Sequence, residues 1–108
     1  MKYNLRKEMV MNFDKLIDAI RADYVARGHD KVLKREWTVV LGRKYAKIVP
    51  TENGKTMGVW GFVQLADDKK FKAGDILMAA GWQGPARNFP RGNIITEDFR
   101  GVTWCGTR

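Results

Sequence analysis

The sequence has one cysteine, Cys105, and one histidine, His29, among its 108 residues. A single cysteine cannot form an internal disulfide, and these two residues cannot supply the ligands of an ordinary Cys/His zinc site. They also lie far apart in the sequence, so a Cys–His catalytic pair is not indicated. We therefore expect no catalytic residues, no metal and no cofactor, and we expect a reducing compartment, most simply the cytoplasm.

Long hydrophobic runs and acidic residues are also scarce. No stretch approaches the roughly 20 apolar residues of a membrane span, and no signal-peptide core follows the charged N-terminus. Against 12 Asp and Glu stand 20 Lys and Arg, which gives a formal net charge of +8. Because a small basic chain attracts polyanions, we expect a nucleotide or nucleic acid as the partner, and no membrane.

Hydrophobic periodicity predicts one helix near the N-terminus, over residues 12–27. Its apolar positions recur at three- and four-residue steps, with Asn12 as the expected N-cap and Gly28 as the expected stop. Residues 1–11 are expected to be flexible or to form an interface, and residues 29–36 to add a short helical turn. All 108 residues are predicted to form a single domain. The apolar positions of the helix are Phe13, Leu16, Ile17, Ile20 and Tyr24.

After residue 36 the apolar pattern alternates, which predicts short strands. Pro50 is expected to end one strand, and Asn53-Gly54 to close a hairpin, because both positions of a type I′ turn need positive φ. The elements together predict an α+β fold: one N-terminal helix packed on a curved, mainly antiparallel five- to six-stranded sheet or partly open barrel. The expected strands are 37–41, 45–49, 57–65, 75–80 and 101–105, with 57–65 at the centre and Trp60 and Phe62 on one of its faces.

The most distinctive stretch is residues 81–93, with the sequence GWQGPARNFPRGN. Its three glycines and two prolines exclude a helix or a central strand and predict a loop with fixed bends. Such a loop can hold guanidinium groups for phosphate, amides for base edges and an indole for stacking. The alternative is a structural loop whose indole fills the core and whose arginines are solvated. The predicted ligand-binding residues are Trp82, Arg87, Asn88, Arg91 and Asn93, with Arg43 and Lys44 from the hairpin at 42–44.

The cations change in type along the chain. Six basic residues and one acid lie between Lys31 and Lys47, whereas every cation after Lys72 is an arginine. Lysine suffices for long-range attraction, and arginine suits bidentate or stacking contacts, so the two regions are expected to attract and to contact the ligand, respectively. Apolar surroundings predict core positions for Trp60, Trp104 and Cys105.

One resemblance rests on residues 71–82, FKAGDILMAAGW, continued by PARN at 85–88 and RGN at 91–93. These segments resemble a C-terminal signature of small uncharacterised proteins of tailed bacteriophages. The similarity includes the strand VWGFV at 59–63 and the helix, and so covers most of the chain after residue 11. It implies an accessory protein acting in the host cytoplasm. Such proteins often block host machinery, including defence systems that signal through nucleotides.

The predicted function is non-enzymatic binding of a phosphate-bearing nucleotide, which in a phage context would sequester a host defence signal. Two alternatives stay open. A basic nucleic-acid-binding accessory protein would show a steeper salt dependence, and an inhibitor of a host protein would use an exposed apolar patch.

A homodimer is also expected. A single helix covers one side of a sheet whose central strand is apolar on both faces, and Met9, Val10 and Met11 add further apolar surface. The alternative is a sheet that curls into a barrel and buries both faces within one chain.

Overall fold

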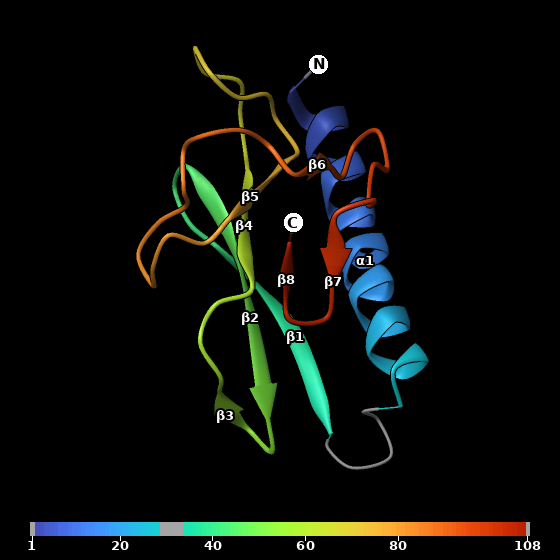
Figure 1. The fold of residues 1–108 in the computed structure, drawn as a ribbon. Coiled ribbons are helices and arrows are strands. Elements are labelled where there is room, and N and C mark those ends of the chain that lie inside the picture. Colours follow the sequence, from blue (N-terminus) through green and yellow to red (C-terminus); the bar gives the residue numbers. More distant parts are fainter. Residues whose placement is uncertain (1, 29–33, 108) are drawn as a thin grey trace.

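The structure is a computed structural model that describes residues 2–28 and 34–107, with side chains from residue 12 onward. One helix packs against a mainly antiparallel six-stranded sheet, in the order β1-β2-β4-β5-β6 with β3 paired to β2 (Figure 1). This confirms the α+β prediction; the described strands form an open sheet, not a closed barrel. The elements are α1 (Lys2–Ala26), β1 (Arg35–Leu41), β2 (Tyr45–Glu52), β3 (Lys55–Thr56), β4 (Gly61–Gln64), β5 (Asp75–Met78), β6 (Gly92–Asn93), β7 (Val102–Thr103) and β8 (Gly106–Thr107).

Helix α1 begins ten residues earlier than the apolar pattern predicted. Residues 2–11 are rich in Lys, Leu, Arg, Glu and Met, whose high helix propensity continues the helix where amphipathic spacing is unclear. Asn12 is therefore no N-cap. Its buried Nδ2 donates to the carbonyl oxygen of Ile94 at 2.7 Å and joins the helix to the C-terminal region. The stop at Gly28 is confirmed, with φ at +78°.

Strand β2 continues through Pro50, which was expected to end it. β2 pairs with β4 as far as Ile48 and with β3 from Thr51. Pro50 thus lies where the strand changes its neighbour, a position at which a missing N–H costs little. The hairpin at Asn53-Gly54 is confirmed, since both residues have positive φ, 50° and 80°. Of the helical turn expected over residues 29–36, residues 29–33 lie outside the described residues, and Arg35 already belongs to β1.

The main core lies between α1 and the inner face of the sheet. The helix residues Leu16 and Ile20 are fully buried there. β4 is central, between β2 and β5, as predicted. However, Trp60 precedes β4 and packs in the main core with Val63, whereas Phe62 faces the other side. The predicted pairing of Trp60 with Phe62 on one face is wrong, because the chain leaves strict alternation before Gly61.

The outer face of the sheet, away from α1, carries a second and smaller core. Phe62, Phe71 and Leu77 are at most 2% exposed, and Tyr45 packs against them. Phe71 comes from the β4–β5 connection, so the chain covers its own second face. The two-sided apolarity that motivated the homodimer prediction is satisfied here within one chain, and the homodimer stays a prediction.

The predicted strand 101–105 is instead the hairpin β7–β8, in which Trp104 and Cys105 form the turn. Cys105 is exposed, contrary to the core prediction, because it lies at the tip of this turn. Trp60 is buried as predicted, and Trp104 is partly buried. β7 contacts α1 and β8 contacts β5, so the hairpin bridges helix and sheet (Figure 1). The backbone N–H of Trp104 donates to Asp23 Oδ2 at 2.9 Å, which fixes the hairpin to the helix.

Candidate functional site

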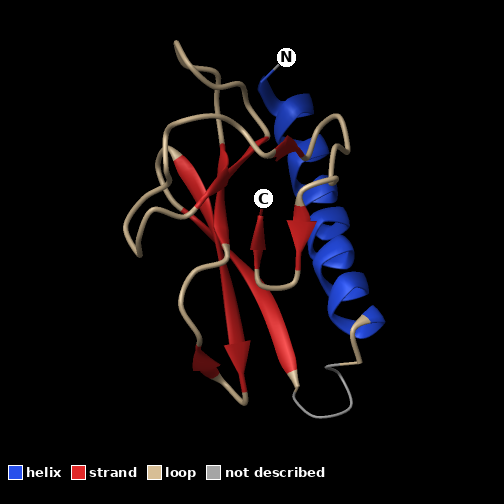
Figure 2. Ribbon diagram, viewed as in Figure 1, coloured by secondary structure: helices blue, strands red, loops and turns tan. Residues whose placement is uncertain are grey.

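The long connection between β5 and β6 runs as a loop over residues 79–91 (Figure 2). Its first half is a tight turn, because the N–H of Ala80 and the N–H of Gly81 both donate to the carbonyl of Gly84. The N–H of Ala86 then returns to the carbonyl of Met78 at 2.8 Å. Trp82 lies at the tip of this turn and is 52% exposed, so it does not fill the core.

A groove of about 280 Å³ lies beside this tip, on the outer face of the sheet. We call it the cationic groove, because three of its described lining residues are cations and none is acidic. The cations Arg43 and Lys44 belong to the β1–β2 turn, and Lys47 belongs to β2. The lining residues are Val40, Gly42, Arg43, Lys44, Tyr45, Lys47, Phe62 and Gln83.

Lys47 connects the cationic groove with the exposed indole. Its Nζ lies 4.4 Å from the centroid of the Trp82 ring and 6.0 Å from that of Phe62. A cation over an exposed aromatic face is stabilised by about 0.5–1 kcal/mol. The ammonium group therefore lies over one face of the exposed indole, at the edge of the groove.

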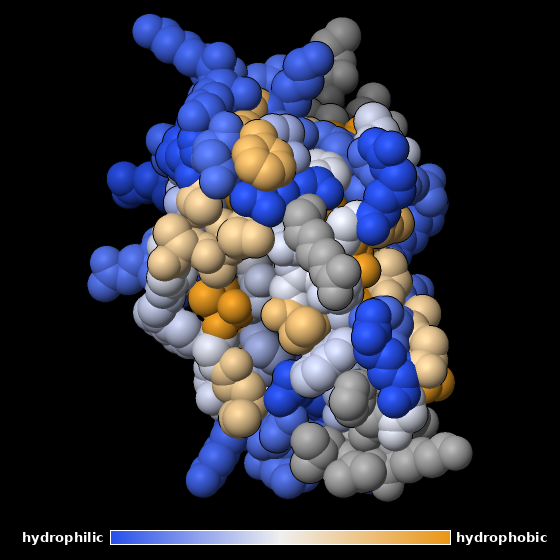
Figure 3. Space-filling model, in the orientation of Figure 1, coloured by the Kyte–Doolittle hydropathy of each residue, from blue (hydrophilic) through white to orange (hydrophobic). Residues whose placement is uncertain are grey.

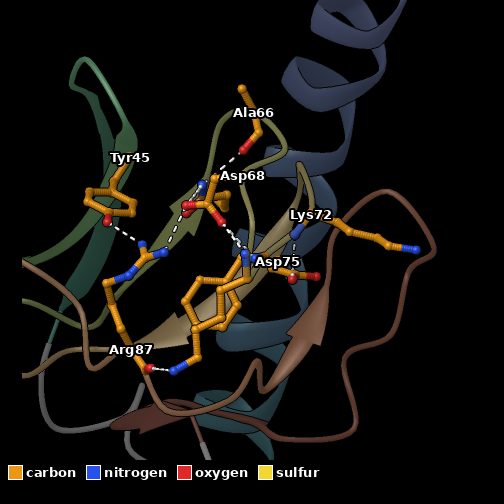
Figure 4. Close-up of polar contacts among 9 residues, drawn as sticks. Tyr45, Ala66, Asp68, Lys72, Asp75 and Arg87 are labelled. Atoms are coloured by element: carbon orange, nitrogen blue, oxygen red, sulfur yellow. Dashed lines mark hydrogen bonds and ion pairs between the residues drawn. The ribbon is translucent and has the colours of Figure 1, made fainter.

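Arg87 points into a polar cluster of its own chain (Figure 4). Its Nη1 donates to Tyr45 Oη at 2.6 Å, and its Nη2 donates to Asp68 Oδ2 at 2.8 Å. Its guanidinium carbon lies 4.6 Å from the centroid of Phe71, and its carbonyl accepts a hydrogen bond from Lys70 Nζ. Arg87 holds the Tyr45 side chain at the edge of the cationic groove, and its predicted role as a phosphate ligand stays a prediction.

The Asp68 carboxylate is the anchor of this cluster. It accepts hydrogen bonds from the backbone N–H groups of Phe71 and Lys70, at 2.7 and 2.8 Å. These two bonds and the bond from Arg87 hold the pKa of Asp68 far below its usual range. In turn, the hydrogen bond to Asp68 raises the pKa of Arg87. The charge of Arg87 is thus largely balanced within the chain.

Asn93 and Asn88 fix the loop, one of the two roles predicted for them. Asn93 Nδ2 donates to Asp75 Oδ1 at 2.9 Å, and its Oδ1 accepts the N–H of Ile95 at 2.7 Å. Asn88 Oδ1 accepts the N–H of Phe89 at 2.8 Å. Both amides are therefore engaged with their own chain.

A second pocket, of about 500 Å³, surrounds β6. We call it the β6 pocket. Arg100 donates to both carboxylate oxygens of Asp98, at 2.9 and 3.1 Å, which raises the pKa of Arg100 and lowers that of Asp98. Arg91 stacks on Phe89 with its guanidinium carbon 3.9 Å from the ring centroid. The lining residues are Asp75, Pro90, Arg91, Gly92, Asn93, Asp98, Arg100 and Gly101.

The seven predicted site residues do not form one cluster, and most lie either at the cationic groove or at the β6 pocket. Arg43 and Lys44 line the cationic groove, and Trp82 adjoins it through Lys47. Arg87 reaches the groove only through Tyr45. The other three, Asn88, Arg91 and Asn93, lie in or next to the β6 pocket.

Sequence reasoning missed Tyr45, Lys47 and Gln83. Strand alternation was the available signal, because residues two apart on a strand share a face. Tyr45 and Lys47 follow the Arg43-Lys44 turn at that spacing.

Hydrophilic side chains gather at the upper end of the face in Figure 3, over the β4–β5 connection, and apolar side chains form small patches below them. Among the described residues, no group of three or more His, Cys, Asp or Glu side chains could hold a metal ion. No helix in the described part of the chain is apolar enough over a sufficient length to cross a membrane.

The sequence matches no curated protein. No solved structure matches it either. One family model, described as a family of unknown function (DUF7717), matches residues 1–107. The chain therefore belongs to the DUF7717 family.

Proposed function

We propose that this protein binds a phosphate-bearing nucleotide unit without catalysis, and that the cationic groove is the binding site. The observation that carries the proposal is the charge of Arg43, Lys44 and Lys47, which form no ion pair with a described residue and lie beside an exposed indole. Lysine and arginine donate charge-assisted hydrogen bonds to phosphate oxygens, and an exposed aromatic face accepts any base. The groove offers both within one small surface.

The chemistry of the lining favours binding over catalysis. None of the described lining residues is Asp, Glu, His, Cys, Ser or Thr, so the groove has no pair of nucleophile and general base. The Tyr45 hydroxyl accepts a hydrogen bond from a guanidinium group, which fixes its orientation. We assign Arg43, Lys44 and Lys47 to phosphate and Trp82 to the base.

The resemblance to phage accessory proteins supports a biological setting for this activity. In that setting the protein acts in the cytoplasm of an infected host, where binding would withdraw a nucleotide signal from a defence system. This setting is part of the proposal and depends on the nucleotide site itself.

Calorimetric titration with thymidine 5′-monophosphate and a cyclic dinucleotide tests the site. Because one charge-assisted hydrogen bond is worth about 1.5–3 kcal/mol, Lys47→Gln should weaken binding about ten- to a hundredfold. Lys55→Gln is the matched control. Lys55 is exposed and lies opposite Glu52 in the β2–β3 pairing, at the other end of β2 and about 23 Å from Tyr45 by strand length. Unchanged affinity in a folded Arg43→Gln/Lys47→Gln double variant would remove the site assignment.

A further inference from the structure

The cationic groove is one part of a longer surface on which cations and aromatic rings are in contact. At the groove, Lys44 Nζ lies 5.9 Å from the centroid of the Tyr45 ring. The rings of Tyr45 and Phe62 meet edge to face with their centroids 6.0 Å apart, and Lys47 lies over Phe62. Trp82 then follows on the other side of Lys47. These contacts join the β1–β2 turn to the tip of the 79–91 loop.

The same surface continues beyond Tyr45 in the other direction. The guanidinium of Arg87 donates to the Tyr45 hydroxyl (Figure 4). It also lies over the Phe71 ring. Lys70 Nζ lies 5.7 Å from the centroid of that ring. An unbroken series of contacts therefore links the groove to the β4–β5 connection, which lies outside the groove.

Most of the positive charge on this surface is free of carboxylates. In the part of the chain that the structure describes, Lys44, Lys47 and Lys70 form no ion pair, and neither does Arg43. The one acid in this series of contacts, Asp68, is engaged by Arg87. An anionic ligand would therefore meet four cations without displacing a carboxylate.

The groove is small for a ligand that it would have to enclose. Pockets that enclose a small ligand usually measure about 300–1,000 Å³, and this one measures about 280 Å³. The indole beside it is half exposed. A shallow site at one part of a longer cationic surface fits one unit of a polymer better than a free nucleotide.

We propose that the ligand of this surface is single-stranded nucleic acid. One nucleotide occupies the cationic groove with its base on Trp82, and neighbouring phosphates lie along the surface as far as Lys70. The inference depends on the proposed nucleotide site in the groove, and it puts a strand in place of the free nucleotide signal. Because every base has a stacking face, binding depends little on base sequence.

Fluorescein-labelled oligothymidylates of two, four and eight nucleotides, followed by anisotropy, test the inference. Affinity should rise with length up to the octamer. With four cations on phosphates, octamer affinity should fall about fiftyfold between 50 and 200 mM salt, against about sevenfold for a ligand that meets two cations. An octamer that binds no tighter than the dinucleotide overturns the inference and leaves the proposed function of the groove intact.

Substitution of Lys70 tests the far end of the surface. Lys70→Gln should reduce the slope of log affinity against log salt by about 0.7 for the octamer, the share of one phosphate contact on a single strand. Lys70→Arg keeps the charge and should restore the slope, and Lys55→Gln should leave it unchanged. An unchanged slope in Lys70→Gln overturns the inference. Failure of every oligomer and mononucleotide to bind overturns both the inference and the proposed function.

Discussion

The cationic groove and the β6 pocket contain similar residue types in opposite arrangements. In the β6 pocket, Arg100 is paired with Asp98 and Asp75 lines the same space. In the groove, Arg43 and Lys47 share the lining with no acidic residue among the described positions. An anion entering the β6 pocket must compete with a carboxylate of the same chain, whereas an anion entering the groove meets no carboxylate among the described lining residues.

The surroundings of an arginine decide which contacts its guanidinium group makes, more than its presence in a distinctive loop does. The three arginines of the loop and its flank, Arg87, Arg91 and Arg100, are engaged by a carboxylate or stacked on an aromatic ring. Hydrogen bonds to their own chain hold Asn88 and Asn93 as well. Side chains of the 81–93 segment therefore mainly hold the loop itself in shape. The segment places Trp82 and Gln83 beside a groove whose charges come from β2 and the β1–β2 turn.

If the β6 pocket serves to hold the fold together, adding a side-chain atom where its backbone is tightly packed should have the largest effect on stability. A Cβ at Gly92 would lie 2.3 Å from the carbonyl oxygen of Asp98. Such overpacking typically costs about 1–3 kcal/mol, so Gly92→Ala should lower the urea midpoint strongly. Gly84→Ala is the matched control, because a Cβ there meets nothing within 4 Å. Equal stability of the two variants would show that the close approach at β6 is not needed.

The next largest effect is expected from the arginines, because Arg100 is paired with Asp98 whereas Arg43 forms no ion pair with a described residue. Arg43→Gln should weaken nucleotide or oligonucleotide binding about ten- to a hundredfold, because it removes one charge-assisted contact from the groove. Arg100→Gln, in the β6 pocket, should leave that affinity unchanged. Titrations of both variants under the same buffer conditions decide the matter. A loss in Arg100→Gln as large as that in Arg43→Gln would transfer the site to the β6 pocket.

The fold could be predicted from the sequence wherever neighbouring residues alone determine the local structure. The Asn53-Gly54 hairpin was predictable because two consecutive residues required positive φ, and α1 because apolar spacing marked its buried face. Asn12 and Pro50 were misread, since each is explained by a partner distant in sequence or by a change of neighbouring strand.

The candidate site was harder to predict from the sequence, because its arrangement also depends on partners that are distant in the chain. Residue types suited to a nucleotide could be recognised, and Arg43, Lys44 and Trp82, which the structure brings to one groove, were predicted from them. The neutralisation of Arg87 depends on Asp68, which is 19 residues away. No local sequence pattern predicts the contact between Arg87 and Asp68. It forms only after the β4–β5 connection has folded over the outer face of the sheet.

A smaller effect is expected where an arginine acts through another residue. Tyr45→Phe removes the hydroxyl that Arg87 holds and should weaken octamer binding less than Arg43→Gln does. Arg87→Gln should have a similar effect, because both changes release the Tyr45 ring. The Arg87→Gln/Tyr45→Phe double variant should then lose little more than either single variant, as expected for coupled residues. Fully additive losses would mean that Arg87 contacts the ligand directly.

The smallest expected effect is a difference between Asp68 and Asp98 in how much each contributes to the pH dependence of stability. Both carboxyls have a lowered pKa, mainly through backbone N–H groups for Asp68 and mainly through Arg100 for Asp98. A lowered folded-state pKa adds stability that is present above the unfolded pKa, about 4, and is lost as pH falls below it. Asp68→Asn should therefore flatten the acid limb of stability, measured as the urea midpoint between pH 5 and pH 2. Asp98→Asn should change it less, because the side chain of Arg100 is 90% exposed and the ion pair is screened by solvent. An acid limb flattened equally by both substitutions would mean that a carboxylate held by backbone N–H groups and one held by an exposed arginine stabilise this fold alike.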